Sequence, residues 1–273
     1  MFTAVTIAKL VEQNQLSFDA TLGSLLPAYP ATEARAQVTV HHLLTMSSGI
    51  PDLFRVPEFW AGLGTIKTLP DFWRYFAASP LQFLPGTQWA YSNSNFLLLG
   101  AIIEQNTGRA FTSVVEEQVI RPLGLTATRY TFDSSRKPAM GYTRTGAGRR
   151  SRGIPGRWYP AWEEPKAGDD FVVGSPMGGG YSTADDLTRF ADALMANRLL
   201  GAEMTARVLT GYVDAEYGGR DSYARSLVPD EGQALASRPD RQAATFLIWP
   251  NFRVCAAEEI RPGRREVVSP VTY

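Results

Sequence analysis

The sequence predicts an α/β protein of the α+β kind, in which helices fill most of the first two hundred residues and strands are few. Apolar residues recur with the 3.6-residue period of a helix in several stretches, the strongest of which covers 95–107. The clearest strand-like run is 243–249, with 253–256 as a second candidate. Of the 273 residues, 44% are hydrophobic and 20% are charged, so the chain can build a core and is not disordered over most of its length.

The first helix is predicted at the very start of the chain. Phe2, Val5, Ile7 and Leu10 fall on one stripe, but no Ser, Thr, Asp or Asn precedes Phe2 to cap the helix. A short frayed start is the simple explanation for the missing cap. No basic segment or small-residue cleavage site marks a signal peptide here, and the compartment of the protein stays open.

The elements that follow are short. A turn and irregular structure are predicted over 15–32, and a short helix over 41–46, with Gly49 placed just after its end. The aromatic-rich stretch 51–80 predicts one or two helices, and 80–86 predicts a loop.

Longer helices are predicted in the second half of the helical region. The helix at 95–107 is closed by Gly108, and a further helix covers 111–120. A Ser or Thr cap followed by acidic residues predicts a helix that runs from 183 to about 197. The stretch 199–210 predicts one more helix. Between them, the polar stretch 134–170 predicts a long surface loop or lid.

Charge and metal-ligand content exclude several classes of protein. Lysine and arginine total 27 and so do aspartate and glutamate, which leaves a net charge of zero and no basic excess for a nucleic-acid partner. The single cysteine, Cys255, and the adjacent His41 and His42 make no metal site of usual spacing, and no cofactor is implied. No run of about 18 apolar residues occurs, so no membrane span is expected.

Four segments in a fixed order resemble a known enzyme family. They are 1–26, 38–50 (VTVHHLLTMSSGI), 83–111 (FLPGTQWAYSNSNFLLLGAIIEQNTGRAF) and 177–194. Together they look like the serine beta-lactamase-related hydrolases, which include class C beta-lactamases, D-alanyl-D-alanine carboxypeptidases and family VIII-type esterases. The resemblance covers roughly residues 1–210. It implies a beta-lactamase/transpeptidase-like fold, with a helical domain and an antiparallel sheet that is incomplete in this chain.

The family's chemistry requires three sequence elements. A Ser-x-x-Lys opens a helix and places serine and lysine one turn apart on the same face. A Tyr-x-Asn lies on a loop of the helical domain, and a Lys-Thr-Gly or His-x-Gly lies on a strand. Serine is a poor nucleophile without an adjacent base, which a desolvated lysine or a tyrosine beside it can supply.

The Tyr-x-Asn element is present as Tyr91-Ser92-Asn93. The resemblance implies that Tyr91 is a catalytic proton shuttle and that Asn93 is a hydrogen-bond partner of a substrate amide or of the lysine. Ser92, Gly179 and Gly180 are expected to contact the substrate. A buried loop tyrosine satisfied by its neighbours is the structural alternative for Tyr91.

The Ser-x-x-Lys element is not found at the first helix. Relatives commonly read S-x-x-K-M-F-T-A there, whereas this chain begins at M-F-T-A. The resemblance implies that the lysine would stand immediately before Met1, with the serine three residues earlier. A late start site or a truncated gene would explain both the missing motif and the uncapped helix, and would also remove the preceding strands of the sheet.

The third element is also not found. Anchoring on Trp249-Pro250-Asn251 puts 235–238 where relatives carry a Gly-His-Gly-Gly-like stretch, and neither the histidine nor the glycines are there. Tyr217-Gly218-Gly219 matches the Trp-x-Gly variant of the esterase branch only weakly. We therefore divide the chain into a beta-lactamase-related domain at 1–217 and a C-terminal segment at 218–273. The C-terminal segment has eight arginines and no lysine, so it is either divergent or frame-altered.

Other nucleophiles fit less well. No Gly-x-Ser-x-Gly elbow occurs, Ser47 and Ser48 are expected to cap a helix, and His41 and His42 are expected to be one packed and one solvated residue.

The function that follows is acyl transfer to water through a serine acyl-enzyme. The substrate would be a small ester, a beta-lactam or a peptidoglycan-type D-Ala-D-Ala amide. Without the nucleophile, the chain as given is expected to be inactive or nearly so. A non-catalytic protein that binds a peptidoglycan-like or ester ligand beside Tyr91 and Asn93, and a gene fragment without a selected role, remain alternatives.

Overall fold

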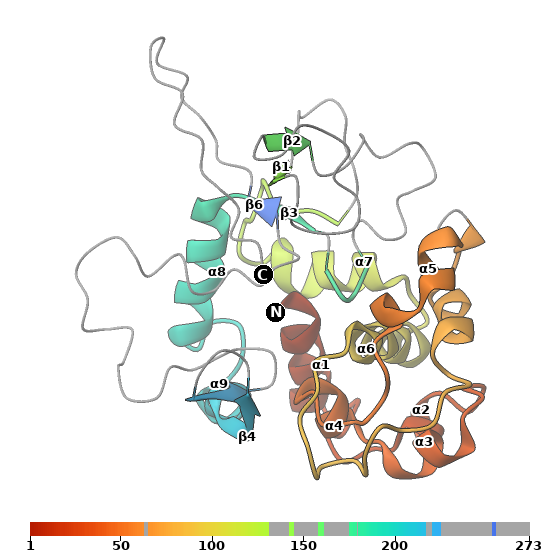
Figure 1. The fold of residues 1–273 in the computed structure, drawn as a ribbon. Helices are drawn as coiled ribbons and strands as arrows, with labels where there is room; N and C mark the ends of the chain where they lie inside the picture. The colour runs from red at the N-terminus through yellow and green to blue at the C-terminus, as the bar shows by residue number, and fades with distance from the viewer. Residues whose placement is uncertain are drawn as a thin grey trace.

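The structure is a computed structural model. It describes residues 1–62, 65–130, 175–178 and 180–216, together with the backbone of strands at 142–144, 158–160, 220–224 and 253–254. Figure 1 shows most of the helices gathered around α6 (Asn93–Thr107), with α1 (Phe2–Glu12) beside it and the start of the chain near the middle of the molecule.

Helix α6 is the central element. Every residue from Asn93 to Ile103 is buried, so the helix is enclosed on all sides instead of showing one polar face. It contacts α1, three further helices described below, and the short helical turns that follow residue 52. Its end is the one that the sequence predicts, because Gly108 takes the left-handed conformation with φ 66° and donates its N–H to the Glu104 carbonyl. Its start, at Asn93, is two residues earlier than predicted.

Helix α1 confirms the predicted first helix, and no side chain caps its start. Its first turns are buried almost all round, and the Phe2 ring packs against Phe190 and Tyr130 at centroid distances of 4.6 and 6.2 Å. The Thr3 hydroxyl donates to the Pro176 carbonyl at 2.7 Å. The start of α1 is therefore fixed by residues from the far end of the described chain.

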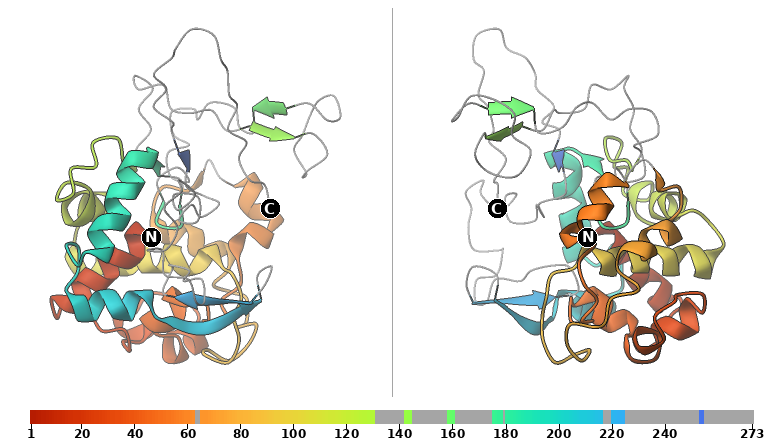
Figure 2. Two further views of the ribbon diagram at one scale, coloured as in Figure 1. Left: turned by 90° about the vertical axis from the view of Figure 1, so that its left-hand side faces the viewer. Right: turned by 45° about the vertical axis from the view of Figure 1, so that its right-hand side comes forward.

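The remaining helices are short. They are α2 (Leu22–Leu25), α3 (Thr32–Gln37), α4 (Val40–Leu44), η1 (Leu53–Arg55), α5 (Pro57–Ala61), η3 (Leu69–Tyr75), α7 (Phe111–Val115) with its π-helical continuation η4 (Glu116–Ile120), α8 (Ala184–Met195) and α9 (Ala202–Leu209). Among its described residues, the aromatic stretch contains the α-helix α5 and the 3-10 turns η1 and η3, and the predicted helices at 111–120, 183–197 and 199–210 are confirmed. Thr183 caps α8 by accepting the Asp186 N–H, as the sequence predicts. Figure 2 shows α8 and α9 lying against α1.

The prediction for Gly49 is wrong. Helix α4 ends at Leu44, and the left-handed residue after it is Met46, with φ 58°. Gly49 has φ +75° for a different reason: a Cβ there would overlap the carbonyl of Phe83. Glycine is needed because the loop at 80–86 passes directly over the backbone, where the Gln82 N–H donates to the Gly49 carbonyl at 2.8 Å.

The strands form three separate pairs among the described residues, not one antiparallel sheet. The antiparallel pairs are β1 (Tyr142–Arg144) with β2 (Trp158–Pro160) and β4 (Gly211–Glu216) with β5 (Arg220–Ala224), and the parallel pair is β3 (Tyr181–Ser182) with β6 (Arg253–Val254). The expected antiparallel sheet is therefore not observed in the described part of the chain. The candidate strand at 253–256 is confirmed in part by β6, whereas the one at 243–249 and most of the polar stretch at 134–170 lie outside the described residues.

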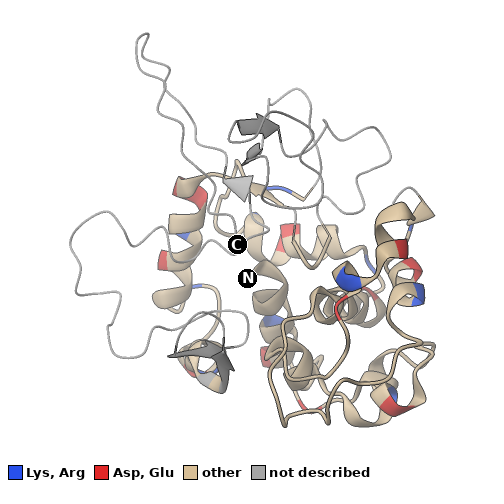
Figure 3. Ribbon diagram, viewed as in Figure 1, with Lys and Arg blue, Asp and Glu red and all other residues tan. Residues whose placement is uncertain are grey.

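Charge is dispersed over the described surface. Figure 3 shows basic and acidic residues interspersed along the helices. None of the helices that the structure describes is both long enough and apolar enough to cross a lipid bilayer.

A substitution at Gly100 tests how closely α6 approaches the turn at Pro176. A Cβ at Gly100 would overlap the Pro176 ring. Alanine is ordinarily better than glycine inside a helix by about 1 kcal/mol. Here we expect Gly100→Ala to lower the free energy of unfolding by about 1–3 kcal/mol in urea denaturation, because overpacking outweighs helix propensity. Adding Pro176→Gly should restore part of the loss, because it removes both ring carbons that the new Cβ would meet. A Gly100→Ala chain as stable as the parent would show that α6 does not approach this turn closely.

Candidate active site

Tyr91 and Asn93 meet at the start of α6. The half-buried Tyr91 donates its hydroxyl to Asn93 Oδ1 at 3.1 Å, and Asn93, the first residue of the helix, is buried. The Tyr-x-Asn element is therefore one hydrogen-bonded unit. Its tyrosine stands before the helix and its asparagine stands on it.

Asp52 completes this unit, and the sequence analysis missed it. Both carboxylate oxygens accept from Asn93 Nδ2 at 3.2 Å, and Oδ1 also accepts from the Asn93 backbone N–H at 3.3 Å. The same oxygen accepts the Phe54 N–H at 3.2 Å, which makes Asp52 the N-cap of η1. An aspartate directly before a short helical turn is a recognisable cap in sequence, and that signal could have drawn attention to Asp52.

Burial and hydrogen bonding act on the Asp52 carboxyl in opposite directions. Loss of hydration raises its pKa above the ordinary 3.8, because the charged form is disfavoured away from water. The hydrogen bonds from Phe54 and Asn93 and the charge of Arg55 lower it. On balance the pKa of Asp52 is raised. Its carboxylate oxygens accept hydrogen bonds from groups that the backbone holds in place.

A second contact joins α6 to the segment before Asp52. Ser48 Oγ donates to Asn95 Oδ1 at 2.7 Å, and Asn95 Nδ2 donates to Met46 Sδ at 3.3 Å. Ser47 Oγ instead lies 2.8 Å from the hydroxyl of Thr45. The expectation that Ser47 and Ser48 cap a helix is wrong, because both hydroxyls are buried and bonded to other side chains.

The third contact comes from Ser94. Its hydroxyl donates to the Pro51 carbonyl at 2.7 Å and accepts the Leu53 N–H at 3.1 Å. Each of the first three residues of α6 therefore bonds to the segment 46–53. These bonds fix the position of α6 along its axis and its rotation about that axis, and so the place of Asn93.

The Ser92 hydroxyl is buried without a partner. Ser92 is 1% exposed, its Oγ makes no hydrogen bond to any described residue, and its backbone N–H donates to Met46 Sδ at 3.5 Å. An unsatisfied buried hydroxyl costs about 1–3 kcal/mol. Gly180 is also buried, and Gly179 lies outside the described residues. Substrate contact by Ser92, Gly179 and Gly180 stays a prediction.

The two histidines have structural roles. His42 Nδ1 accepts the Thr39 N–H at 3.2 Å in the capping box of α4, and burial lowers the pKa of His42. The His41 ring packs edge-on against Tyr212 with centroids 5.0 Å apart. Both are half-buried, so the division into one packed and one solvated histidine is wrong.

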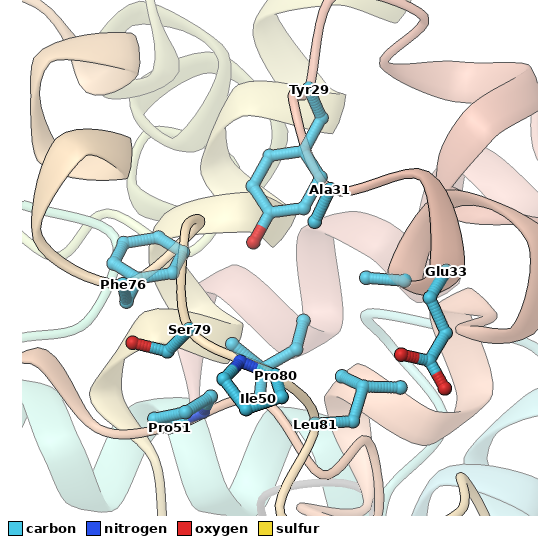
Figure 4. Close-up of a pocket in the computed structure, with 10 residues that line it drawn as sticks. Tyr29, Ala31, Glu33, Ile50, Pro51, Phe76, Ser79, Pro80 and Leu81 are labelled. Carbon is cyan, nitrogen blue, oxygen red and sulfur yellow. The ribbon is translucent and has the colours of Figure 1, made fainter.

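A small cavity lies behind the segment that carries Asp52. Figure 4 shows Tyr29, Phe76 and Pro80 around it, together with Ile50 and Pro51, which directly precede Asp52. Its lining is largely apolar, and burial raises the pKa of Tyr29. The Tyr91–Asn93 pair is not part of this lining, so the cavity is separate from the candidate site.

The start of α1 is tied to the helix that carries Asn93. Thr3 bonds to Pro176, and the ring of Pro176 lies against Gly100 of α6. At 1.5 Å per residue, Gly100 stands about 10 Å along the helix from Asn93. Burial lowers the pKa of the Met1 amino group from 8.0 to about 5, because the charged form is disfavoured there.

Comparisons with known proteins match most of the chain. A protein-family model described as Beta-lactamase matches residues 1–232. Esterase EstB of Burkholderia gladioli is 27% identical over 230 aligned positions, and the match covers 71% of this chain and 54% of EstB. The D-alanyl-D-alanine-carboxypeptidase/endopeptidase AmpH of Escherichia coli (strain K12) is 29% identical over 137 aligned positions, and the match covers 48% of this chain and 34% of AmpH. The chain thus spans about half or less of the length of these relatives.

The fold agrees with solved structures. The crystal structure of a penicillin binding protein from Bacillus halodurans is similar over 82% of this chain and 64% of that protein, with a TM-score of 0.66 and 33% sequence identity. This similarity confirms the predicted beta-lactamase/transpeptidase-like fold, which is represented mainly by helices in the described residues.

The buried Met1 amino group predicts that the 273-residue chain gains stability between about pH 5 and about pH 8. The folded-state pKa lies below the unfolded one, so the unfolded chain binds the proton more tightly in this range. Below about pH 5 the amine is charged in both states, so the folded chain carries the whole cost of burying the charge. Above about pH 8 the amine is neutral in both states, and this cost is absent. Urea unfolding across this range should show a smaller pH dependence after N-terminal acetylation. Identical profiles for the free and acetylated chains would show that the amine is not enclosed.

Proposed function

This chain belongs to the beta-lactamase family, and on that premise we propose that the complete protein is a serine hydrolase that transfers an acyl group from an ester or amide to water. The observation that carries the proposal is the hydrogen-bonded Tyr91–Asn93 pair, held at the start of α6 by Asp52. EstB is an esterase and AmpH a carboxypeptidase/endopeptidase by name, which supports ester and amide substrates, with beta-lactams and D-Ala-D-Ala amides as candidates.

Tyr91 is the proton shuttle in this proposal. Its hydroxyl is half-buried and bonded to Asn93 Oδ1, so its oxygen is held in a fixed place. Asn93 Nδ2 is already engaged by both oxygens of Asp52, whereas Oδ1 is a carbonyl oxygen, which can accept more than one hydrogen bond. Of the two roles that the resemblance implies for Asn93, this favours accepting a hydrogen bond from a lysine over donating to a substrate amide.

The proposal places the nucleophile in a Ser-x-x-Lys that immediately precedes Met1 in the complete protein. Supporting observations are the M-F-T-A sequence at the start of α1, the enclosure of that start and its link to α6 through Pro176. A serine and a lysine one turn apart on a helix share a face. A second Ser-x-x-Lys occurs at Ser134–Lys137, outside the described residues, and is directly followed by Pro138, which disfavours a helix there.

The reaction then follows from the positions of these groups. The serine oxygen attacks the acyl carbon while its proton passes to the uncharged amine of the lysine, either directly or through the Tyr91 hydroxyl, which releases its own proton to the amine as it takes that of the serine. Backbone N–H groups stabilise the negative oxygen of the tetrahedral intermediate, and the leaving group departs with the proton. Water attacks the acyl-enzyme by the same route and releases the acid.

The 273-residue chain alone should be nearly inactive. We expect it to hydrolyse p-nitrophenyl butyrate at least about 10³-fold more slowly than the protein extended by its own preceding residues, because the covalent route is missing. The extended protein should also be labelled by a fluorescent penicillin. In the 273-residue chain, Ser134→Ala should leave any residual rate unchanged. Turnover by the 273-residue chain through a stable serine adduct would contradict the proposal.

Variants of the extended protein provide the control for Tyr91. Tyr91→Phe should lower kcat about 10²–10⁴-fold, as expected when a proton-transfer group is removed. Tyr75→Phe removes another half-buried hydroxyl, outside the Tyr91–Asn93–Asp52 network, and should leave kcat unchanged. A ligand-dependent rise in melting temperature without any turnover would favour a non-catalytic binding protein.

A further inference from the structure

Building on the proposed function, we infer that Asp52 is a positioning residue that decides which end of the Asn93 carboxamide faces Tyr91. The two ends of a carboxamide have nearly the same shape but opposite hydrogen-bonding character, because the oxygen accepts and the nitrogen donates. The orientation of Asn93 therefore sets what Tyr91 can do with its own proton.

The Asp52 carboxylate fixes this orientation. An ionised carboxylate only accepts hydrogen bonds, so the nitrogen of Asn93 must face it, and both carboxylate oxygens lie 3.2 Å from that nitrogen. Asn93 Oδ1 is thereby turned toward Tyr91, 3.1 Å from the tyrosine hydroxyl. The direction of the hydrogen bond between Tyr91 and Asn93 follows from the charge state of Asp52.

The consequence for Tyr91 is a defined proton arrangement. Its single proton points at Asn93, so its lone pairs are directed away from the asparagine and can accept a hydrogen bond from the serine or lysine of the proposed site. With the carboxamide turned over, the nitrogen would donate to Tyr91 and would occupy one of these lone pairs. That arrangement would stabilise the phenolate over the phenol.

The carboxylate itself is held by two backbone donors. The N–H groups of Phe54 and Asn93 both point at Asp52 Oδ1, so this position requires an acceptor. In Asp52→Asn, the same two donors would select the carbonyl oxygen of the new side chain for this position. Its nitrogen would then take the place of Oδ2 and face the nitrogen of Asn93. The Asn93 nitrogen would then keep only the oxygen at the Oδ1 position, which it shares with two backbone N–H groups, and would meet a donor in place of Oδ2, which favours turning the Asn93 carboxamide over.

The test is a titration of Tyr91 in the 273-residue chain, followed by NMR of ring-labelled tyrosine, with Tyr91→Phe to assign the signal. We expect Asp52→Asn to move the titration midpoint of Tyr91 to lower pH by about one unit or more, because a donor replaces an acceptor beside its oxygen. Asp52→Ser removes the same charge and keeps a residue that can cap η1, but it supplies no amide group. Its shift of the Tyr91 titration midpoint should therefore be clearly smaller.

A second aspartate provides the matched control. Asp71 also accepts backbone N–H groups at the start of a short helix, from Lys67 at 2.8 Å and Thr68 at 2.7 Å, but takes no part in the Tyr91 network. Asp71→Asn should leave the Tyr91 midpoint in place. Equal shifts in Asp52→Asn and Asp52→Ser would show that only the charge matters, and no shift in Asp52→Asn would show that Asn93 does not turn. Either result would overturn the inference.

The titration needs no turnover, so it stands apart from the proposed function. In the extended protein, Asp52→Asn should then lower kcat more than Asp52→Ser does, with little difference between their KM values. A shifted titration in a protein that hydrolyses nothing would reject the serine hydrolase and retain the positioning role of Asp52. If Asp52→Asn stays active and the titration of Tyr91 does not shift, the positioning role of Asp52 would be rejected and the serine hydrolase retained.

Discussion

The structure depends on one constraint: the first turn of α6 is polar and fully buried. Asn93, Ser94 and Asn95 cannot reach water, so each must find its hydrogen-bond partners inside the protein. The segment 46–53 supplies them with a carboxylate, a hydroxyl, a thioether and backbone groups. This set of bonds fixes α6 in the core. Tyr91 is positioned because it stands two residues before Asn93, the first residue of that helix, and is hydrogen-bonded to it.

Local rules recovered the elements that depend on neighbours in sequence. The end of α6 at Gly108, the Thr183 cap of α8 and the apolar stripe of α1 all follow from contacts within a few residues. The candidate site was found only in part, because the contacts that build it join distant positions. Asp52 and Asn93 are 41 residues apart, and Ser48 and Asn95 are 47 apart, so no periodicity or cap rule connects them. Gly49 was misread for the same reason, since its partner is the remote Phe83.

The described residues hold one side of the proposed hydrolytic site, and in this proposal its other side is the start of α1. Tyr91, Asn93 and Asp52 provide fixed hydrogen-bonding groups, while the Pro176 turn bonds to α1 and packs against α6. A family that works through a serine acyl-enzyme needs both sides at a constant separation, because proton transfer depends on short, directed contacts. The first turn of α1 is enclosed, since Phe2, Thr3 and Ala4 are all buried.

The most direct measurement of whether α1 carries the nucleophile is to locate the modified residue by mass spectrometry after the complete protein has reacted with a fluorophosphonate. We expect the adduct on a serine three residues before a lysine that directly precedes Met1, with labelling lost when that serine is replaced by alanine. An adduct on Ser48, Ser92 or Ser134 would contradict this assignment, and so would a protein that turns over ester with no serine adduct.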